Sequence, residues 1–366
     1  MQCVLIAAGG TGGHIFPAIA VAEKLQEQGV RLHWVGSCRG LEERLVAPDF
    51  PITYLSMEAL RGKRLRQRLL FPFRFLRALK QVWSVVSEIK PDVVLVMGSF
   101  VSVPVGVVSW LRRIPLVVHE QNAKPGMANR LLMHFASTVL QAFPDTFSQS
   151  IGAITVGNPL RSEFLVKLST AATRTAIDSR LRILVLGGSQ GAHAINSVMI
   201  EWVEQYGGDQ IISLWHQVGS AHFDVVKKQY DLLNCGVKLE AFIDDMAVAY
   251  QWADIVICRA GAMTVSEISA MAKPAIFIPF PAAVDDHQYY NAHFLAADQA
   301  AIVLRQSVFT AEKLQEIINK FIQNPADLAM MSSRIREHAR LSATDDVEQQ
   351  LYLASGHKRK RLMNVE

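Results

Sequence analysis

The chain has 366 residues, of which 50% are hydrophobic and 19% are charged. This length suggests about two domains, and this composition excludes a globally disordered chain. The formal net charge of +4 is unevenly distributed, because residues 1–158 carry 17 Lys and Arg against 10 Asp and Glu, whereas residues 159–354 carry 16 against 22. The basic first part therefore indicates a polyanionic partner or an anionic membrane surface.

Short apolar runs rich in β-branched residues alternate with amphipathic segments of helical length along the whole chain. This alternation predicts right-handed βαβ units and a mostly parallel sheet, with strands covered on both faces. The expected strands are 2–8, 31–36, 52–55, 93–97, 115–118, 137–141, 153–156, 181–187, 211–216, 237–241, 254–258, 274–278 and 301–304.

Three features bear on the cellular setting. The four cysteines include no Cys-x-x-Cys pair, which argues against a zinc site or a disulfide framework and is typical of a reducing compartment. No basic segment precedes the first apolar run, so no signal peptide is expected. The stretch Val93 to Leu111 carries no charge, but Gly98 and Pro104 interrupt it, so we expect a strand, a loop and a helix rather than a membrane span.

A glycine-rich strand exit occurs twice in the chain. Val4–Gly13 and Ile183–Gly191 each read as a strand, a glycine turn with a hydroxyl residue, and a helix start. The repeat predicts two Rossmann-like, doubly wound α/β domains with a ligand in the crevice between them. We expect the domains over 1–157 and 158–335, followed by a last helix at about 336–355 that could return to the first domain, and a basic tail over 356–366.

The turn Gly9–His14 favours an anion or sugar site, since glycines let backbone N–H groups approach a ligand at a helix N-terminus. A tight turn alone is the simpler alternative. The turn is no dinucleotide fingerprint, because Ile15 stands where a small residue is needed and no acidic residue ends the second strand. The turn Gly187–Ala192 supports the same anion-binding argument in the second domain, with the Ser189 hydroxyl as an added donor.

Two further segments of the second domain carry candidate binding residues. In Arg259–Glu267, the carboxylate of Glu267 could bind two ribose hydroxyls or could only balance the dipole of its helix. The polar run Asp285–Asn291 suits sugar hydroxyls. We assign no metal to its two aspartates, because adjacent side chains diverge and no third ligand is evident.

His14 and the run His119–Asn122 are expected at strand exits of the first domain, facing the crevice. A histidine there titrates near neutrality and can deprotonate an acceptor hydroxyl. For either histidine taken alone, a bond to the backbone is an equally good interpretation.

Residues 59–87 contain eight basic and no acidic residues, interleaved with large apolar ones. This pattern is typical of a surface that settles into an anionic leaflet; nucleic-acid binding and a solvated basic face are the competing interpretations. The expected membrane contacts are Arg61, Lys63, Leu69, Leu70, Phe71, Phe73, Phe75, Leu76, Leu79 and Trp83.

These motifs together resemble the peptidoglycan glycosyltransferases of family 28. The resemblance covers nearly the whole chain and rests on Gly9–Pro17, Leu60–Lys63, His119–Asn122, Gly157–Arg161, Gly187–Ala192, His216–Gln217, Phe242–Met246, Arg259–Glu267 and Asp285–Asn291. It implies the GT-B fold, in which two Rossmann-like domains face each other across a cleft. It also implies an inverting transfer of N-acetylglucosamine from UDP-N-acetylglucosamine to the C4 hydroxyl of an undecaprenyl-pyrophosphoryl-N-acetylmuramoyl-pentapeptide.

The resemblance further implies roles for individual residues. Ile243 would contact uracil, Glu267 the ribose, and Gln288 and Asn122 the sugar. Ser189 and the helix start would hold the diphosphate, with Arg161 close by. The residues of this helix start are Ala262, Met263, Thr264, Val265 and Ser266. Thr11, Gly12 and Gly13 would lie on the cleft side of the donor and acceptor diphosphate. Since inversion needs one base on the acceptor side, we expect His14 to be that base, with His119 or Glu120 behind it. The enzyme would act without metal or cofactor, bind no nucleic acid, and work at the cytoplasmic side of the inner membrane.

One turn departs from the family pattern Gly-Gly-Tyr-x-Ser-Gly-Pro. Here it reads Gly98-Ser-Phe-Val-Ser-Val-Pro104, so Ser99 and Val103 stand where the pattern has glycines. Two other functions remain as alternatives at this point: a UDP-N-acetylglucosamine epimerase of related fold, which would not need the basic-apolar surface, and a membrane-tethered nucleotide-sugar sensor.

Overall fold

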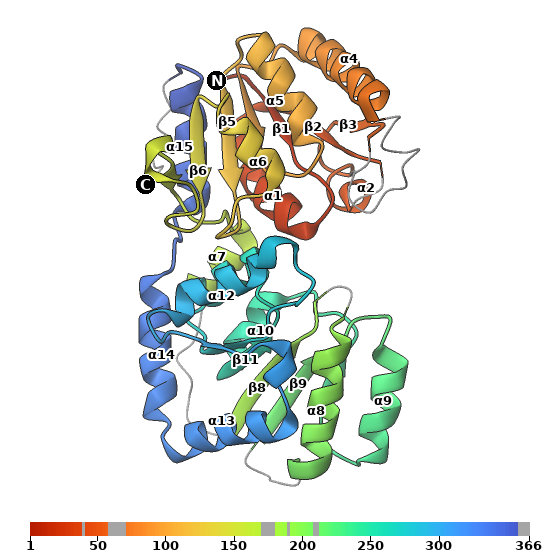
Figure 1. The fold of residues 1–366 in the computed structure, drawn as a ribbon, viewed down its shortest axis with the longest axis vertical. Coiled ribbons are helices and arrows are strands. Elements are labelled where there is room, and N and C mark those ends of the chain that lie inside the picture. The colour runs from red at the N-terminus through yellow and green to blue at the C-terminus, as the bar shows by residue number, and fades with distance from the viewer. Residues whose placement is uncertain (39–40, 58–70, 170–179, 189–190, 208–211, 358–366) are drawn as a thin grey trace. The chain divides into compact units, whose positions relative to one another are not determined.

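The computed structural model describes residues 1–38, 41–57, 71–169, 180–188, 191–207 and 212–357. The chain forms two compact units (Figure 1). Unit 1 comprises Met1–Arg161 and Leu341–Glu366, and unit 2 comprises Ser162–Arg340. The last helix, α15 (Ala343–Ala354), belongs to unit 1, where Tyr352 donates a hydrogen bond over 2.9 Å to Oε1 of Gln28, the residue that follows α1.

Unit 1 is built on a parallel sheet with the strand order β3-β2-β1-β4-β5-β6-β7. Its strands are β1 (Cys3–Ala7), β2 (Arg31–Ser37), β3 (Ile52–Leu55), β4 (Val93–Val96), β5 (Leu116–Glu120), β6 (Thr138–Gln141) and β7 (Ile154–Thr155). Its other helices are α1 (Gly12–Glu27), α2 (Glu42–Leu45), α4 (Phe71–Ile89), α5 (Ser102–Leu111), α6 (Met127–Leu132) and the 3₁₀ turn Gln149–Ile151.

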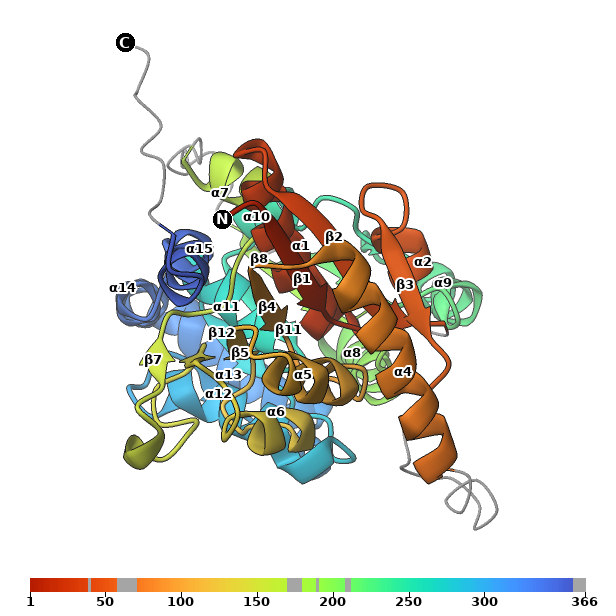
Figure 2. The same ribbon diagram turned by 90° about the horizontal axis from the view of Figure 1, so that it is seen from above.

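Successive residues of β1 point to opposite faces of this sheet, and a separate apolar core lies on each face. Val4 and Ile6 pack with α1 and α15, whereas Leu5 and Ala7 pack with α4 and α5 (Figure 2). Both faces are therefore covered, which explains why the strands are apolar at consecutive positions.

Unit 2 repeats the design with the parallel strand order β10-β9-β8-β11-β12-β13. Its strands are β8 (Leu181–Leu186), β9 (Ile212–Gln217), β10 (Lys238–Glu240), β11 (Ile255–Cys258), β12 (Ala275–Phe277) and β13 (Ile302–Val303). Its helices are α7 (Ser162–Ser169), α8 (His193–Tyr206), α9 (Phe223–Leu232), α10 (Met246–Trp252), α11 (Ala262–Ala270), α12 (His287–Ala296), α13 (Ala311–Gln323) and α14 (Ala326–Glu337), with 3₁₀ turns at Val284–Asp286 and Gln306–Val308.

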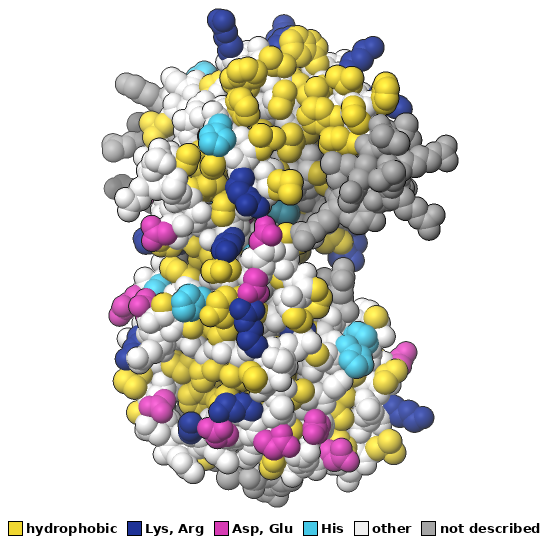
Figure 3. All heavy atoms as spheres, viewed as in Figure 1, with side chains coloured by type: hydrophobic (Ala, Val, Ile, Leu, Met, Phe, Trp, Pro, Cys, Tyr) yellow, Lys and Arg dark blue, Asp and Glu magenta, His cyan; other side chains and the backbone are white. Residues whose placement is uncertain are grey.

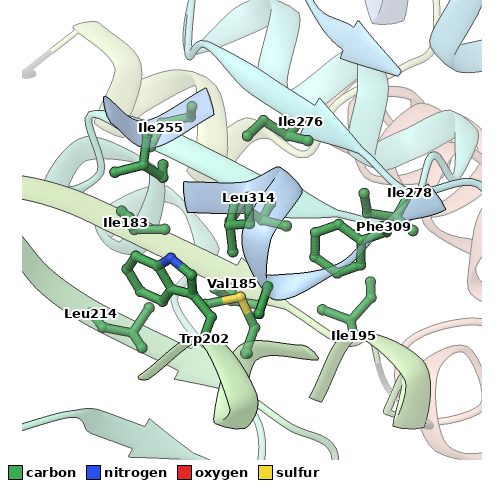
Figure 4. Packing of buried hydrophobic residues seen from close by; sticks show 14 of the residues in the cluster. Ile183, Val185, Ile195, Trp202, Leu214, Ile255, Ile276, Ile278, Phe309 and Leu314 are labelled. Carbon is green, nitrogen blue, oxygen red and sulfur yellow. The ribbon is translucent and has the colours of Figure 1, made fainter. Parts of the chain in front are cut away.

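Trp202 of α8 is fully buried in the core of unit 2, where it packs beside Ile183 and Val185 of β8 (Figure 4). Its indole N–H donates to Gln315 Oε1 on α13 over 2.8 Å, so the one polar atom of the ring is satisfied. Full burial of such side chains stabilises the unit by roughly 1.5–3 kcal/mol each.

The sequence-based fold class is confirmed: both units are doubly wound parallel α/β structures, and each expected strand is present. Val93–Leu111 forms a strand, a loop and a helix, as expected. No helix among the described residues is long and apolar enough to cross a membrane.

Candidate active site

The strand order places a candidate site in each unit. In unit 1 the chain runs outward from β1 to β3 and then returns to β4 on the other side of β1. In unit 2 it makes the same reversal between β8 and β11. Ligands of doubly wound sheets bind at the carboxyl ends of the two strands that flank this reversal. The turns that follow β1, β4, β8 and β11 are therefore where binding residues are expected.

In unit 1 a buried glutamate holds the glycine turn after β1. Glu42 Oε1 accepts hydrogen bonds from Gly10 N (3.1 Å) and from the N and Oγ of Ser37 (both 2.8 Å). A Cβ at Gly9 would stand 2.5 Å from this oxygen, so a larger residue there would displace the Glu42 carboxyl group from its donors. One N–H of the turn is thus satisfied by the protein's own carboxyl group.

The start of α1 leaves room for a ligand. A Cβ at Gly12 would stand 2.8 Å from the ring of Phe16, so a larger residue there would have to move that ring. A Cβ at Gly13 would meet nothing closer than Thr11 Oγ1 at 3.8 Å, so packing does not require a glycine at this position. The absence of a side chain at Gly13 lets a ligand approach the N-terminus of the helix closely.

His14 lies between the exits of β1 and β4. The Nδ1 of His14 is 3.3 Å from Thr11 Oγ1. Gly98, which follows β4, lies on the other side of the ring, since a Cβ built on it would stand 3.2 Å from His14 Nε2. The same Cβ would stand 3.3 Å from Asn129 Nδ2. When Nδ1–H donates to the Thr11 hydroxyl, Nε2 carries the lone pair and can accept a proton. This geometry suits a general base.

His119 does not face outward, contrary to the expectation from its place at a strand exit. It is fully buried, its Nε2–H donates to Gly157 O (2.9 Å), and its Nδ1 accepts from Gln121 Nε2 (2.9 Å). Burial lowers the pKa of His119 to about 4, so the ring is neutral near pH 7. Both ring nitrogens are engaged within unit 1, which is the arrangement of a structural histidine.

Glu120 is also buried, and it organises the loop after β5. Its Oε1 accepts from the backbone N (2.9 Å) and Nδ2 (3.1 Å) of Asn122, and its Oε2 accepts from Gly126 N and Asn129 Nδ2 (both 2.9 Å). Four donors on one carboxyl group fix the loop that carries Asn122.

Arg161 is the last residue of the first segment of unit 1. Its guanidinium lies 5.3 Å from the ring centre of Phe16.

In unit 2 a neutral amide holds the corresponding glycine turn after β8. Gln217 Oε1 accepts from Gly188 N (3.1 Å), and its Nε2 donates to the carbonyls of Gly188 and Ala241 (both 3.0 Å). The sequence motif His216–Gln217 contained this residue, but only the structure shows its contact with the turn. Ser189 lies outside the described residues.

Helix α11 begins directly after β11, with Gly261 as its N-cap. The side chains of Ala262 and Val265 are buried, so these positions can offer a ligand only their backbone, whereas Met263, Thr264 and Ser266 are partly exposed. Glu267 Oε2 accepts from the hydroxyl of Tyr250 at 3.1 Å. Burial raises the pKa of Tyr250 well above its usual value, so the tyrosine remains a donor that orients the carboxyl group.

Two arginines fix the loop after β12 through hydrogen bonds and an ion pair. Arg259 donates to the carbonyls of Ile278 (2.9 Å) and Pro279 (3.3 Å), and Arg305 forms a two-pronged ion pair with Asp286 (2.8 and 2.7 Å). Gln288 Oε1 accepts from Phe280 N at 2.9 Å, which fixes the side-chain amide at the start of α12.

Ile243 is buried, whereas its neighbour Phe242 is 51% exposed. Any contact of Ile243 with a planar base therefore involves its backbone or the small part of its side chain that remains exposed. Phe242 offers the larger apolar surface at this position, which sequence reasoning did not single out.

Helix α4 presents apolar side chains to solvent. Phe73, Leu76 and Trp83 are 71%, 61% and 44% exposed, whereas Phe71, Phe75 and Leu79 pack partly against the core. On the neighbouring helix α5, Trp110 and Leu111 are also half exposed, which sequence reasoning missed. Figure 3 shows hydrophobic side chains gathered on the surface of unit 1. Arg112 lies 4.8 Å from the ring centre of Trp83. Arg61, Lys63, Leu69 and Leu70 lie outside the described residues.

Comparison with known proteins gives matches along nearly the whole chain. Residues 4–141 match the glycosyltransferase family 28 N-terminal domain, and residues 182–349 match the glycosyltransferase family 28 C-terminal domain. A protein of Coxiella burnetii named UDP-N-acetylglucosamine--N-acetylmuramyl-(pentapeptide) pyrophosphoryl-undecaprenol N-acetylglucosamine transferase is 46% identical over 348 residues, covering 95% of this chain and 97% of that protein. A protein of the same name from Shewanella oneidensis is 46% identical over 349 residues, covering 94% and 96%.

Among solved structures, MurG of Acinetobacter baumannii superimposes with a TM-score of 0.80 at 34% identity, covering 96% of this chain and all of that one. The UDP-GlcNAc 2-epimerase of Neisseria meningitidis has a TM-score of 0.67 at 15% identity, covering 96% of this chain and all of that one, which shows a shared fold alone.

Proposed function

The chain belongs to glycosyltransferase family 28, and on that premise we propose that it transfers N-acetylglucosamine from UDP-N-acetylglucosamine to undecaprenyl-pyrophosphoryl-N-acetylmuramoyl-pentapeptide. The C4 hydroxyl of the muramoyl sugar is the acceptor, and the anomeric centre is inverted. The observation that carries the proposal is the 46% identity with transferases of this name over 95% of the chain.

Unit 2 supplies the donor site. The uracil lies at Ile243 and Phe242, and the ribose hydroxyls bind Glu267, which Tyr250 orients. The diphosphate lies at the N-terminus of α11, from Ala262 to Thr264, and at the β8 turn that carries Ser189. A helix N-terminus stabilises the negative charge that grows on the leaving UDP. Gln288 contacts the sugar.

Unit 1 supplies the acceptor chemistry. The proton of the acceptor hydroxyl moves to His14 Nε2 while its oxygen attacks the anomeric carbon and the bond from that carbon to the diphosphate oxygen breaks. A hydrogen bond from His14 Nδ1–H to the Thr11 hydroxyl, whose atoms are 3.3 Å apart, would hold the tautomer that this step requires. Asn122, fixed by Glu120, binds a sugar hydroxyl, and Arg161 contributes positive charge toward the diphosphate. Glu120 and His119 position these groups and do not exchange protons.

The exposed apolar face of α4, extended by Trp110 and Leu111 of α5, is the membrane contact. Basic side chains flank it, among them Arg112 beside Trp83. Apolar side chains enter the acyl boundary while cations attract anionic headgroups, which holds the protein on the cytoplasmic face of the membrane where the lipid acceptor resides.

The test is transfer of label from radioactive UDP-N-acetylglucosamine to a short-chain lipid-linked muramoyl-pentapeptide, without added metal. We expect labelled lipid and released UDP only when the acceptor is present. UDP release or epimerisation of the donor without acceptor would reject the transferase and favour an epimerase. Binding of UDP with no turnover under any condition would favour a sensor.

A further inference from the structure

The segment Gly157–Arg161 closes the first part of unit 1, and its backbone is held within that unit. The ring of His119 donates a hydrogen bond to the carbonyl of Gly157 over 2.9 Å. The hydroxyl of Thr344, on α15, donates to the carbonyl of Leu160 over 3.2 Å. The backbone next to Arg161 is therefore fixed, whereas the direction of its long side chain depends on what that side chain contacts.

The side chain of Arg161 rests on an aromatic ring. Its guanidinium carbon lies over the ring of Phe16, 5.3 Å from the ring centre, and the arginine is half-buried. It forms no hydrogen bond or ion pair with any residue that the structure describes. A ring attracts a cation within about 6 Å through its π electrons. The contact therefore orients the guanidinium while it leaves the N–H groups available to an anion.

The ring of Phe16 is in turn supported by Gly12. Both residues lie in the first turns of α1, and residues four apart on a helix share one face. A Cβ at Gly12 would stand 2.8 Å from Cε2 and 3.1 Å from Cδ2 of the ring. The ring thus occupies the space that a side chain at Gly12 would need. The glycine supports the ring, and the ring supports the guanidinium.

We propose that Phe16 is a positioning residue for the transfer, because its ring holds the guanidinium of Arg161 ready for the diphosphate of the leaving UDP. The inference rests on the proposed function, which gives Arg161 this role. A carboxylate partner would orient the arginine but would also neutralise its charge, whereas a ring does not. Negative charge grows on the diphosphate as its bond to the sugar breaks, so the arginine matters more for turnover and for bound UDP than for the intact donor.

The test is a double-mutant cycle in the full chain, with Phe16→Leu, Arg161→Ala and the two combined. We expect Phe16→Leu to lower kcat about 3–10-fold and to raise the Kd for UDP by a similar factor, with the KM for UDP-N-acetylglucosamine within about twofold. In the Arg161→Ala background the same substitution should change kcat and the Kd by less than twofold, because the ring then has no cation to hold. Steady-state kinetics and calorimetric titration with UDP measure these constants.

Two further variants separate the aromatic face from the loss of packing. Phe16→Tyr keeps a ring of the same size and should leave kcat and the Kd for UDP within about twofold of the wild type. Tyr206→Leu removes another half-buried aromatic side chain, on the last turn of α8, and should leave all the constants unchanged.

Equal losses from Phe16→Leu with and without Arg161 would show that the ring acts through packing alone, and the proposal would be wrong. It would also be wrong if Phe16→Tyr were as impaired as Phe16→Leu, or if Phe16→Leu moved neither constant by more than twofold. If the wild-type protein transfers no sugar, the proposed function fails and the cycle is read from the Kd for UDP. A loss of UDP affinity that depends on Arg161 would then support the role of Phe16, and any other result would reject it.

Discussion

The glycine turns after β1 and β8 occupy equivalent places in the two units, but different side chains hold them. In unit 1 the turn is held by the carboxyl group of Glu42, and in unit 2 by the neutral amide of Gln217. An ionised carboxyl group beside a turn would oppose the approach of an anion, whereas an amide fixes the backbone without adding charge. The same glycine pattern can therefore serve different ligands, and the residue packed behind the turn decides which.

On the proposed function, this comparison favours the turn of unit 2 for the donor diphosphate and the turn of unit 1 for the neutral reacting groups of the acceptor. Both turns are followed by a histidine in the first turn of the next helix. His14 Nδ1 lies 3.3 Å from Thr11 Oγ1 in unit 1, whereas the ring of His193 in unit 2 packs edge-on against that of His222, with the ring centres 5.7 Å apart.

The largest expected effect is at His14. His14→Ala removes the proposed base and should lower kcat by about 10²–10⁴-fold while UDP affinity stays within twofold, because the proposed UDP site lies in unit 2. Steady-state kinetics and calorimetric titration with UDP measure the two quantities. His134→Ala, an exposed histidine of the same unit, is the control. Unchanged turnover in His14→Ala would remove this residue from the mechanism.

Exchanging the two side chains that hold the turns probes the comparison itself. Gln217→Glu adds negative charge behind the β8 turn and leaves the carbonyls of Gly188 and Ala241 without their donor. We expect UDP to bind about 10–100-fold more weakly, from about 1.5–3 kcal/mol of lost interaction. Glu42→Gln keeps an oxygen for Gly10 N and should leave UDP affinity unchanged. Equal losses in both variants would contradict the assignment.

Glu120→Gln tests whether this residue positions a loop. The substitution replaces one of the two carboxyl oxygens by an NH₂ group, which cannot accept a hydrogen bond. That group would then face either the two donors of Asn122 or the donors of Gly126 and Asn129. We expect the free energy of unfolding to fall by about 2–4 kcal/mol, measured by urea denaturation at neutral pH. A variant with wild-type stability but a displaced acidic limb of the pH–rate profile would instead make Glu120 a proton carrier.

The buried histidines give both units a dependence on pH. Burial lowers the pKa of His119 to about 4 and that of His216 to about 3, from about 6.5 in the unfolded chain. Because the unfolded chain binds protons more readily, the full stability from each neutral histidine is present only above pH 6.5. The free energy of unfolding then falls as the pH drops from 6.5 toward the pKa of that histidine in the folded chain. At pH 5 the loss is about 2 kcal/mol per histidine. His119→Gln should remove its share of the difference in unfolding free energy between pH 7 and pH 5; an unaltered difference would contradict a neutral, buried His119.

The strands, the two doubly wound sheets and the glycine turns could be predicted from the sequence because consecutive apolar residues and glycines act locally. The environment of His119 could not, since its burial depends on Gly157, which is 38 residues away. The contact of Glu42 with Gly10 spans 32 residues in the same way, and no local pattern marks Glu42 as the residue behind the turn. Trp110 resembles a core residue of an apolar helix, and only its packed position shows that it is exposed.

Hydrogen exchange of the full chain with and without saturating UDP tests the assignment of the two turns most directly. We expect slower exchange in the segment that includes Gly187 and Gly188 and at the start of α11 from Ala262 to Glu267, with exchange at Gly9–Gly13 unchanged. Protection at the β1 turn, with none at the β8 turn, would show that the diphosphate binds where Glu42 lies and would contradict the account.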